Sequence, residues 1–389
     1  MDLSSYRRSL MLGIVGLLAV ALAGFAVPSV QARDAKAAGQ VATLRAGLWR
    51  PSDGSVKAIA FDKKRIYIGG DFTTLTGPMG ETVSRSGIAA LNRTTGALIK
   101  RFHPRINGAV TSLAIHRKLL YVGGSFTQVK GLSRNYLVAI KAPSNKVVKK
   151  GWRLQLDAPV RALLHMGKRL YVGGEFHEVA GKKRRSLFAI KKAPRAIKSW
   201  PKIPRATNGA VNALAAGRKG TAVIVGGRFH ELVGKNRVNL GAVTVKKGRA
   251  TAWKPRPGCA TDCPVRDIAV RKGLVFAGID GPGGRVRAYR WSNGSTKWNV
   301  GLNGEVDAVA VSRTSLLLGG HFTQVAGQSR PMVAVLDVAS GALSAKTFTT
   351  TPPNFPGVLE IKVKGKVALL GGTFTEIQGQ ANLSVIKRP

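Results

Sequence analysis

This sequence of 389 residues has very little cysteine, and few acidic residues for its number of basic ones. Only two cysteines occur, Cys259 and Cys263, which excludes a small scaffold held together by many disulfides. Eighteen Asp and Glu stand against 62 Lys and Arg, so the formal net charge is +44. This excess of positive charge predicts that the protein surface attracts polyanions at long range.

Long apolar runs are also scarce, and the uncharged run at residues 10–27 is the longest. It follows Arg7 and Arg8, and Val30-Gln31-Ala32 offers the small-x-small pattern of a cleavage point. The pattern predicts a signal peptide at 1–32, a short linker at 33–47, and a mature protein that is secreted or associated with the cell envelope. An uncleaved anchor is the alternative, and the only predicted route to a membrane, because the run approaches the length needed to span a bilayer.

Export would place Cys259 and Cys263 in an oxidising environment. Because they lie close together in the sequence, we expect them to form one small disulfide loop. A metal site there would need at least two further ligands, and the nearest histidines, His230 and His321, are far along the chain.

One motif recurs through the rest of the sequence. Good copies are IYIGGDFTTLTG from Ile66, LYVGGSFTQVKG from Leu120, LYVGGEFHEVAG from Leu170, VIVGGRFHELVG from Val223, LLLGGHFTQVAG from Leu316 and ALLGGTFTEIQG from Ala368, with a degraded copy, LVFAGIDGPGG, from Leu274. Their spacing of about fifty residues is typical of a propeller blade and not of a helical solenoid.

Short alternating segments surround each copy and predict strands. One precedes it, beginning at Val56, Val110, Val160, Val211, Val265, Val306 and Val358, and further strands follow, the last with an aromatic residue. We therefore predict an all-β protein, a seven-bladed β-propeller of four-stranded antiparallel blades over 48–389.

The aromatic position suggests how the ring closes. It holds Trp49, Phe102, Trp152, Trp200, Trp253, Trp298 and Phe348. Trp49 precedes the first motif and no aromatic follows the last one, so we expect an N-terminal strand containing Trp49 to pair with the strand containing Val385.

The pattern G-G-x-F-T-x-V-x-G, followed by an arginine and a short L-x-A-[IL] strand, resembles the delta-60 repeat β-propellers of exported bacterial proteins. The resemblance covers nearly everything after residue 48 and implies the fold. It implies little about activity, because propellers serve as binding platforms, structural modules and enzymes.

Most of the repeated residues are expected to be structural. The glycine pairs lack the Lys-Ser/Thr or helix start of a phosphate loop and predict close backbone approach. The aromatic position predicts packing between sheets, with a stacking platform as the alternative. The arginines that follow the motif are expected to pair with a backbone carbonyl or an acidic side chain of the next blade: Arg85, Arg134, Arg184, Arg237 and Arg330.

Histidines replace the usual threonine in two neighbouring copies. His177 and His230 are each followed by a glutamate, which suggests a metal site or an acid–base pair. Consecutive strand residues face opposite ways, however, so each histidine and its glutamate would not easily share a site. The other interpretation is a pair of polar surface substitutions.

The second residue of each first strand is expected near the mouth of the central channel, where ligand specificity would lie. These residues are Lys57, Thr111, Arg161, Asn212, Arg266, Asp307 and Leu359. A set of solvated rim residues is the alternative. No nucleophile with its base, no paired carboxylates and no complete ligand set emerges from the sequence.

Positive charge is densest over residues 141–205, with eighteen Lys and Arg against three acidic residues. We expect a basic face that binds polyanions and comprises Lys182, Lys183, Arg185, Lys191, Lys192, Arg195 and Lys198. The predicted function is a non-enzymatic, cofactor-free and monomeric module that binds an anionic partner: envelope phosphate polymer, acidic polysaccharide or nucleic acid. The alternatives are a propeller hydrolase or lyase acting at the channel mouth and a protein–protein scaffold.

Overall fold

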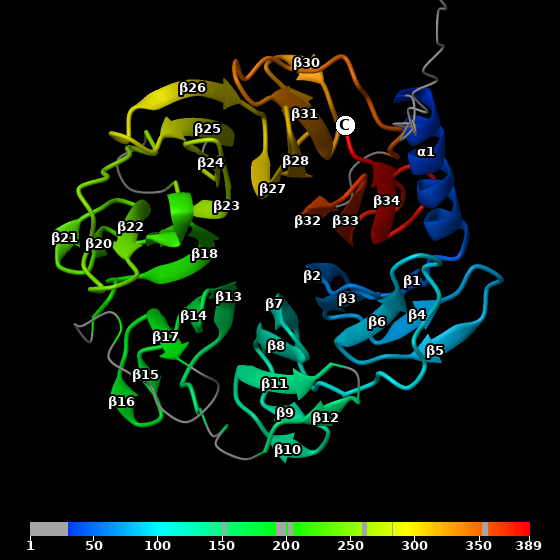
Figure 1. Ribbon diagram of the computed structural model, residues 1–389, viewed down its shortest axis with the longest axis horizontal. Coiled ribbons are helices and arrows are strands. Elements are labelled where there is room, and N and C mark those ends of the chain that lie inside the picture. Colours follow the sequence, from blue (N-terminus) through cyan, green and yellow to red (C-terminus); the bar gives the residue numbers. More distant parts are fainter. Residues whose placement is uncertain are drawn as a thin grey trace, which may run out of the picture.

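The computed structural model describes residues 30–142, 144–149, 152, 154–191, 200, 205–258, 263–281, 283–351 and 357–389 (Figure 1). The described part of the chain is all-β apart from the helix α1 (Val30–Ala46) and one 3-10 turn (Arg218–Gly220). Among the described residues, no helix is long and apolar enough to cross a membrane. The predicted signal peptide lies outside the described residues except for its last three positions, which belong to α1.

Seven sheets of the described chain share one plan, in which an inner strand pairs with a middle strand and the middle strand with a third. The inner strands are β2 (Val56–Phe61), β7 (Val110–His116), β13 (Val160–Met166), β18 (Ala210–Ala216), β23 (Val265–Arg271), β27 (Glu305–Val311) and β32 (Gly357–Lys364). The middle strands are β3 (Arg65–Gly70), β8 (Leu119–Gly124), β14 (Arg169–Gly174), β19 (Ala222–Arg228), β24 (Leu274–Ile279), β28 (Ser315–His321) and β33 (Val367–Thr373). The third strands are β6 (Ile88–Asn92), β11 (Leu137–Lys141), β17 (Leu187–Lys191), β22 (Leu240–Thr244), β25 (Arg285–Arg290), β31 (Val333–Asp337) and β34 (Leu383–Lys387).

A full fourth strand is present in two of these sheets, as β12 (Lys146–Val147) and β26 (Thr296–Gly301). In three others the fourth position is a single antiparallel bridge: Leu91 with Leu98, Val243 with Ala250, and Leu336 with Leu343. Among the described residues, the expected four strands are therefore present in only two of the seven sheets.

Small hairpins lie at the outer ends of the sheets. They are β9 (Gln128–Val129) with β10 (Leu132–Ser133), β15 (Glu178–Val179) with β16 (Lys182–Lys183), β20 (Glu231–Leu232) with β21 (Lys235–Asn236), and β29 (Gln324–Val325) with β30 (Gln328–Ser329). In the first repeat the corresponding strands, β4 (Thr74–Thr76) and β5 (Thr82–Ser84), add β1 (Arg50–Pro51) as a third.

The glycine pairs allow neighbouring sheets to pack closely around a common centre (Figure 1). A Cβ atom on Gly123 would lie 2.5 Å from the Cγ1 atom of Val160 in the next inner strand, and one on Gly173 would lie 2.5 Å from that of Val211. The second glycine of each pair abuts backbone, as Gly174 does at Pro159. A larger residue would force sheets apart, so the structural interpretation of the glycines is confirmed.

The N-terminal segment does not pair as expected. Arg50 and Pro51 pair with Thr76 and Leu75, and β34 pairs with β33 alone among the described strands. The prediction that the Trp49 strand pairs with the Val385 strand is therefore wrong.

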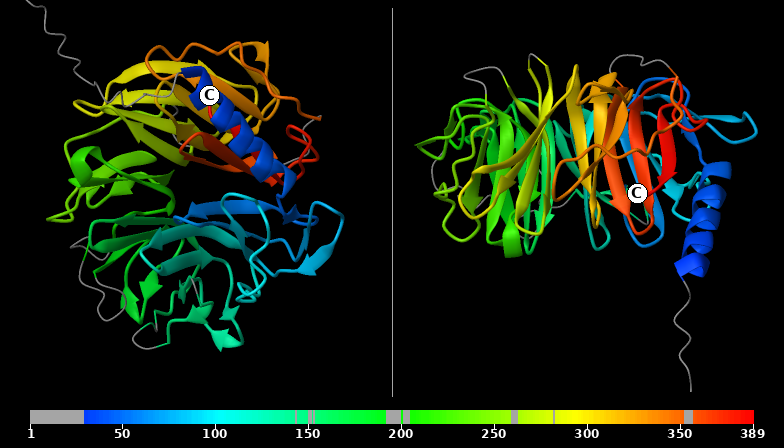
Figure 2. Two further views of the ribbon diagram at one scale, coloured as in Figure 1. Left: turned by 45° about the vertical axis from the view of Figure 1, so that its right-hand side comes forward. Right: turned by 90° about the horizontal axis from the view of Figure 1, so that it is seen from above.

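Helix α1 covers β34 instead, as Figure 2 shows. Arg45 Nη2 donates to the carbonyl oxygen of Val385 at 3.0 Å, and Leu44 is 2% exposed. The segment at 33–47, expected to be a linker, belongs to this helix up to Ala46. Trp49 still packs with Leu369 and Val385 of the last sheet and Ile59 of the first.

The recurrent aromatics pack between sheets as predicted. Trp152 is fully buried beside Tyr121, and Trp200 packs edge-on against Tyr171. Three indoles also donate Nε1–H to a carbonyl of the following repeat: Trp200 to Thr244, Trp253 to Arg290, and Trp298 to Val338. Trp298 and Phe348 are half-buried at the edge of their clusters. A stacking platform for ligands is therefore not what these residues form.

Candidate functional sites

Every inner strand carries a β-bulge at the same place. The register shifts between Val56 and Ala58 in the first sheet, and equivalently in the other six. The bulged residues are Lys57, Thr111, Arg161, Asn212, Arg266, Asp307 and Leu359, and all of them line one cavity of about 590 Å³. A bulge redirects a side chain and often lies near a functional site. The sequence thus identified residues that the structure brings together, while ligand binding there stays a prediction.

The cations of this cavity, which we call the bulge cavity, are neutralised by carboxylates. Lys57 Nζ lies 2.6 Å from Asp71, and Arg161 Nε donates to Glu175 at 2.8 Å. Arg266 Nη2 lies 2.6 Å from Asp280. The bulge cavity therefore offers little net positive charge to an anion.

Two uncharged bulge residues join neighbouring sheets. Thr111 Oγ1 donates to the carbonyl oxygen of Val160 at 2.6 Å, and Asn212 Nδ2 donates to that of Val265 at 3.2 Å. These side chains satisfy backbone acceptors across the sheet boundary and therefore contribute to the fold.

Asp307 is the most perturbed acid of the cavity. Burial raises the pKa of its carboxyl to about 7, Arg266 at 4.0 Å opposes this shift, and the charges of Glu305 and Asp280 add to it. In an adjoining cavity of about 170 Å³, which the bulge residues also line, burial raises the pKa of Glu360 to about 7 although Lys362 Nζ lies 2.6 Å away. A carboxyl that titrates near neutrality can donate or accept a proton, which is the one catalytic property visible here.

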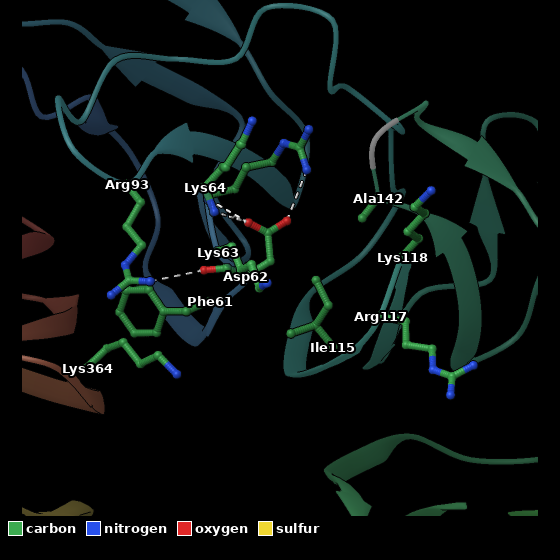
Figure 3. Close-up of a pocket in the computed structure, with 11 residues that line it drawn as sticks. Phe61, Asp62, Lys63, Lys64, Arg93, Ile115, Arg117, Lys118, Ala142 and Lys364 are labelled. Atoms are coloured by element: carbon green, nitrogen blue, oxygen red, sulfur yellow. Dashed lines mark hydrogen bonds and ion pairs between the residues drawn. The ribbon is translucent and has the colours of Figure 1, made fainter.

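A second cavity, of about 630 Å³, lies at the other end of strand β2 (Figure 3). We call it the basic pocket. Its cations are Lys63, Lys64, Arg65, Arg93, Arg117, Lys118 and Lys364. The apolar part of its lining is Phe61, Ile115 and Ala142. These residues come from the first, second and last sheets, so the pocket exists only in the assembled fold.

Asp62 is the one carboxylate lining the basic pocket among the described residues, and it is engaged within its own turn. It accepts hydrogen bonds from the backbone N–H groups of Lys64 and Arg65 at 2.7 and 2.6 Å, and from Tyr67 Oη at 2.9 Å. Burial alone would raise the pKa of Asp62, but these hydrogen bonds outweigh it and lower the pKa. Asp62 therefore organises the turn and leaves most of the surrounding cations without a counter-ion.

The basic pocket belongs to a wider pattern. At or beside the turn between inner and middle strands, every one of the seven sheets presents an exposed cation. These residues, which we call the hairpin cations, are Lys63, Lys64, Arg117, Lys118, Lys168, Arg218, Lys219, Lys272, Arg313 and Lys364. None forms an ion pair with a carboxylate in the described part of the chain. Sequence reasoning missed this set, although the runs DKKR, RK, GRKG and RKG after the inner strands could have revealed it.

The basic residues singled out from the sequence do not form one cluster. Lys182 and Lys183 lie exposed in β16, beyond the end of the middle strand, whereas Lys191 pairs with Arg169 at the opposite end of the sheet. Arg185 is half-buried beside Arg205. Lys192, Arg195 and Lys198 lie outside the described residues.

His177 and His230 occupy turns that a side chain of the preceding segment caps. The backbone N–H groups of His177 and Glu178 donate to Asp157 Oδ1, and those of His230 and Glu231 donate to Asn208 Oδ1. Asp53, Asn107 and Asn303 do the same in other repeats. In the described residues no group of three His, Cys, Asp or Glu could hold a metal ion.

The recurrent arginines bind backbone carbonyls, but within their own repeat. Arg85 donates to Ser84 and Lys100, and Arg237 donates to Thr251 and Trp253. Pairing with a backbone carbonyl is confirmed for these residues, but the predicted partner in the next blade is wrong, because the acceptors lie in the same repeat as the arginine. The hydrogen bonds to Lys100, Thr251 and Trp253 join the outer hairpin to the segment that follows the third strand.

Cys263 is fully buried between two sheets, and its carbonyl accepts a hydrogen bond from Asn239 at 3.0 Å. Cys259 lies outside the described residues, so the disulfide stays a prediction.

Comparison with known proteins defines the fold. No family model and no curated protein matches the sequence. Among solved structures, the chain is similar to the WD40 beta propeller domain of Doa1, at 10% identity and a TM-score of 0.55, covering 88% of this chain and 96% of that one. It is also similar to the computationally designed Ika8 protein, at 14% identity and a TM-score of 0.55, covering 88% of this chain and 98% of that one. At these identities the likeness shows a β-propeller fold and no activity.

Proposed function

We propose that the protein is a seven-bladed β-propeller of the delta-60 repeat kind whose ring is closed. The proposal is supported by the contacts between the last and first sheets. A Cβ on Gly371 would lie 2.5 Å from Val56 Cγ1, the same distance as Gly319 to Val358 within the ring. Strand β32 also packs directly against β2. The edge that a closing strand would cover is instead covered by α1.

We propose further that this propeller is an exported, monomeric and non-enzymatic module that binds anionic polymers of the cell envelope. The observation that carries the proposal is that acidic side chains are mostly paired within the fold, whereas the hairpin cations are not. The described acids mostly serve the fold, as turn caps such as Asp157 or ion-pair partners such as Asp71 and Glu175. The hairpin cations have no such partner and face solvent.

This arrangement favours a polymer over a compact partner. Cations spaced around a ring act together on a ligand with many negative charges, and each neutralised charge releases condensed counter-ions. A scaffold that binds its partners through an apolar interface would expose an apolar patch. Met79 is the one large hydrophobic side chain that is exposed in the described part of the chain, so scaffolding has no support here.

The test is a titration of the mature protein with polyphosphate, with an acidic polysaccharide and with a neutral polysaccharide of similar length, at several salt concentrations. We expect both anionic polymers to bind with an affinity that falls steeply with salt. Binding to the neutral polymer with equal affinity, or no binding to either anionic one at low salt, would contradict the proposal.

A second candidate, a hydrolase or lyase at the bulge cavity, is favoured by one observation: the pKa of Asp307 is raised to about 7 beside Arg266. A general acid or base needs such a value at neutral pH. If this candidate holds, turnover of an acidic polysaccharide would depend on a group titrating near pH 7 and would be lost in Asp307→Asn.

A further inference from the structure

We propose that the basic pocket is a discrete binding site for a small organic phosphate, in which a phosphate group with two or more negative charges is linked to a flat ring. This inference deepens the proposed function, because the pocket lies among the hairpin cations. It names a ligand class that charge alone would not select.

The first argument is the local charge. Six of the seven cations that line the pocket form no ion pair among the described residues, and only Arg65 pairs, with Asp62 at 3.0 Å. Like charges held close together repel one another, and an anion bound between them removes that repulsion. A ligand with one negative charge would leave most of it in place, so the pocket favours at least two.

The second argument is the apolar surface between the cations. Figure 3 shows Arg93 and Lys364 near Phe61, and Arg117 and Lys118 on the far side of Ile115. Phe61 and Ile115 are half-buried, whereas Ala142 is 3% exposed. Inorganic phosphate would leave the exposed parts of Phe61 and Ile115 in water, whereas a ring would cover them and gain the free energy of their burial.

The third argument is the position of Arg93. Its guanidinium lies 5.9 Å from the centroid of the Phe61 ring, and its Nη1 is 3.4 Å from the carbonyl oxygen of Asp62. An arginine held over a ring offers a planar surface for stacking as well as donors for phosphate. The cavity volume of about 630 Å³ lies within the range of small-ligand sites.

The probes are ADP, inorganic pyrophosphate and adenosine, titrated calorimetrically at physiological salt. We expect ADP to bind with a stoichiometry of one and at least tenfold more tightly than pyrophosphate, and adenosine to bind far more weakly than ADP. Equal affinities for ADP and pyrophosphate, or no saturable ADP binding, would overturn the inference.

Variants separate the contribution of the apolar surface to ADP binding from that of the cations. Phe61→Leu, which keeps an apolar side chain but removes the ring, should reduce the preference for ADP over pyrophosphate and leave pyrophosphate binding unchanged. Arg93→Gln with Lys364→Gln should weaken both. Lys182→Gln with Lys183→Gln removes the same charge elsewhere and should change neither, and an equal loss in this control would overturn the inference.

Polymer binding, measured in parallel on the same variants, distinguishes the two proposals. If polyphosphate binds and ADP does not, the pocket inference fails and the polymer proposal stands. If ADP binds and polyphosphate does not, the polymer proposal fails and the pocket inference stands.

Discussion

Gly371 in the last sheet faces Val56 in the first so closely that a Cβ atom on residue 371 would lie 2.5 Å from Val56 Cγ1. The two residues are at opposite ends of the propeller sequence. Their contact repeats the one that Gly123 makes with Val160 and Gly319 makes with Val358. The contact supports the proposed closure of the ring, because the last and first sheets approach each other as closely as these neighbouring sheets do.

Gly371→Ala should lower the free energy of unfolding by about 1–3 kcal/mol, because the new methyl group overpacks the boundary with the first sheet. Gly319→Ala should have a similar effect. Gly301→Ala is the matched control, since nothing lies within 4 Å of a Cβ there. Val56→Ala combined with Gly371→Ala should be less destabilising than the two changes summed. If chemical denaturation finds Gly371→Ala as mild as the control, the two ends are not packed together.

Leu44→Ala should lower the free energy of unfolding by about 2–5 kcal/mol, because Leu44 is 2% exposed and anchors α1 over the last sheet. Gln40→Ala, on the exposed side of the same helix, should be nearly neutral. Denaturation curves of both variants decide the point. Equal and small effects would mean that α1 is dispensable for covering the edge of β34.

Stability should fall as the pH drops below about 6.5, partly because of His165. Its ring stacks on that of His116 at 3.8 Å, and burial together with the charge of His116 lowers the pKa of His165 from 6.5. The folded chain thus resists protonation more than the unfolded chain, so stability is full above the unfolded pKa and is lost below it.

The check is the free energy of unfolding at pH 7 and pH 5. His165→Phe keeps a stacking ring and should show a smaller loss between these values than the original protein. His103→Asn, which removes an exposed histidine, should retain the full loss. An identical pH dependence in His165→Phe would rule out this role for the histidine stack.

Thiol titration of the protein after its proposed export, unfolded but not reduced, should detect no free thiol, because Cys259 and Cys263 are predicted to be joined. After reduction two thiols should appear, and the stability should fall by no more than a few kcal/mol, given the small loop. Two reactive thiols before reduction would exclude the bridge.

The repeats made much of this fold predictable from sequence. Alternation located the inner strands, and the position after each valine picked out Lys57, Arg161, Asp307 and their equivalents, which the bulges bring into one cavity. Period-two patterns indicate which residues of a strand share a face. This is enough to locate equivalent residues when every repeat has the same arrangement of strands.

Three features were not predicted, because they depend on strand direction or on how segments far apart in the sequence assemble. Charge counted along the chain ignores the reversal of antiparallel strands, so Lys182 and Lys191 were grouped although they lie toward opposite ends of their sheet. The aromatic pattern placed Trp49 correctly in the core shared by the first and last sheets. It did not reveal that a helix, α1, covers β34. The basic pocket joins the last sheet to the first two, which no local pattern specifies.

The central claim, that unpaired hairpin cations bind polyanions, is tested most directly by the slope of log affinity against log salt for polyphosphate in two matched double variants. Lys168→Gln with Arg313→Gln removes two hairpin cations, whereas Lys57→Gln with Arg161→Gln removes two cations that are already paired with Asp71 and Glu175. On nucleic acids each lost contact changes the slope by roughly 0.7–0.9. The account predicts a clearly flatter slope and weaker binding for the first variant, and a slope near that of the original protein for the second. Equal changes in both variants, or no change in the first, would contradict it.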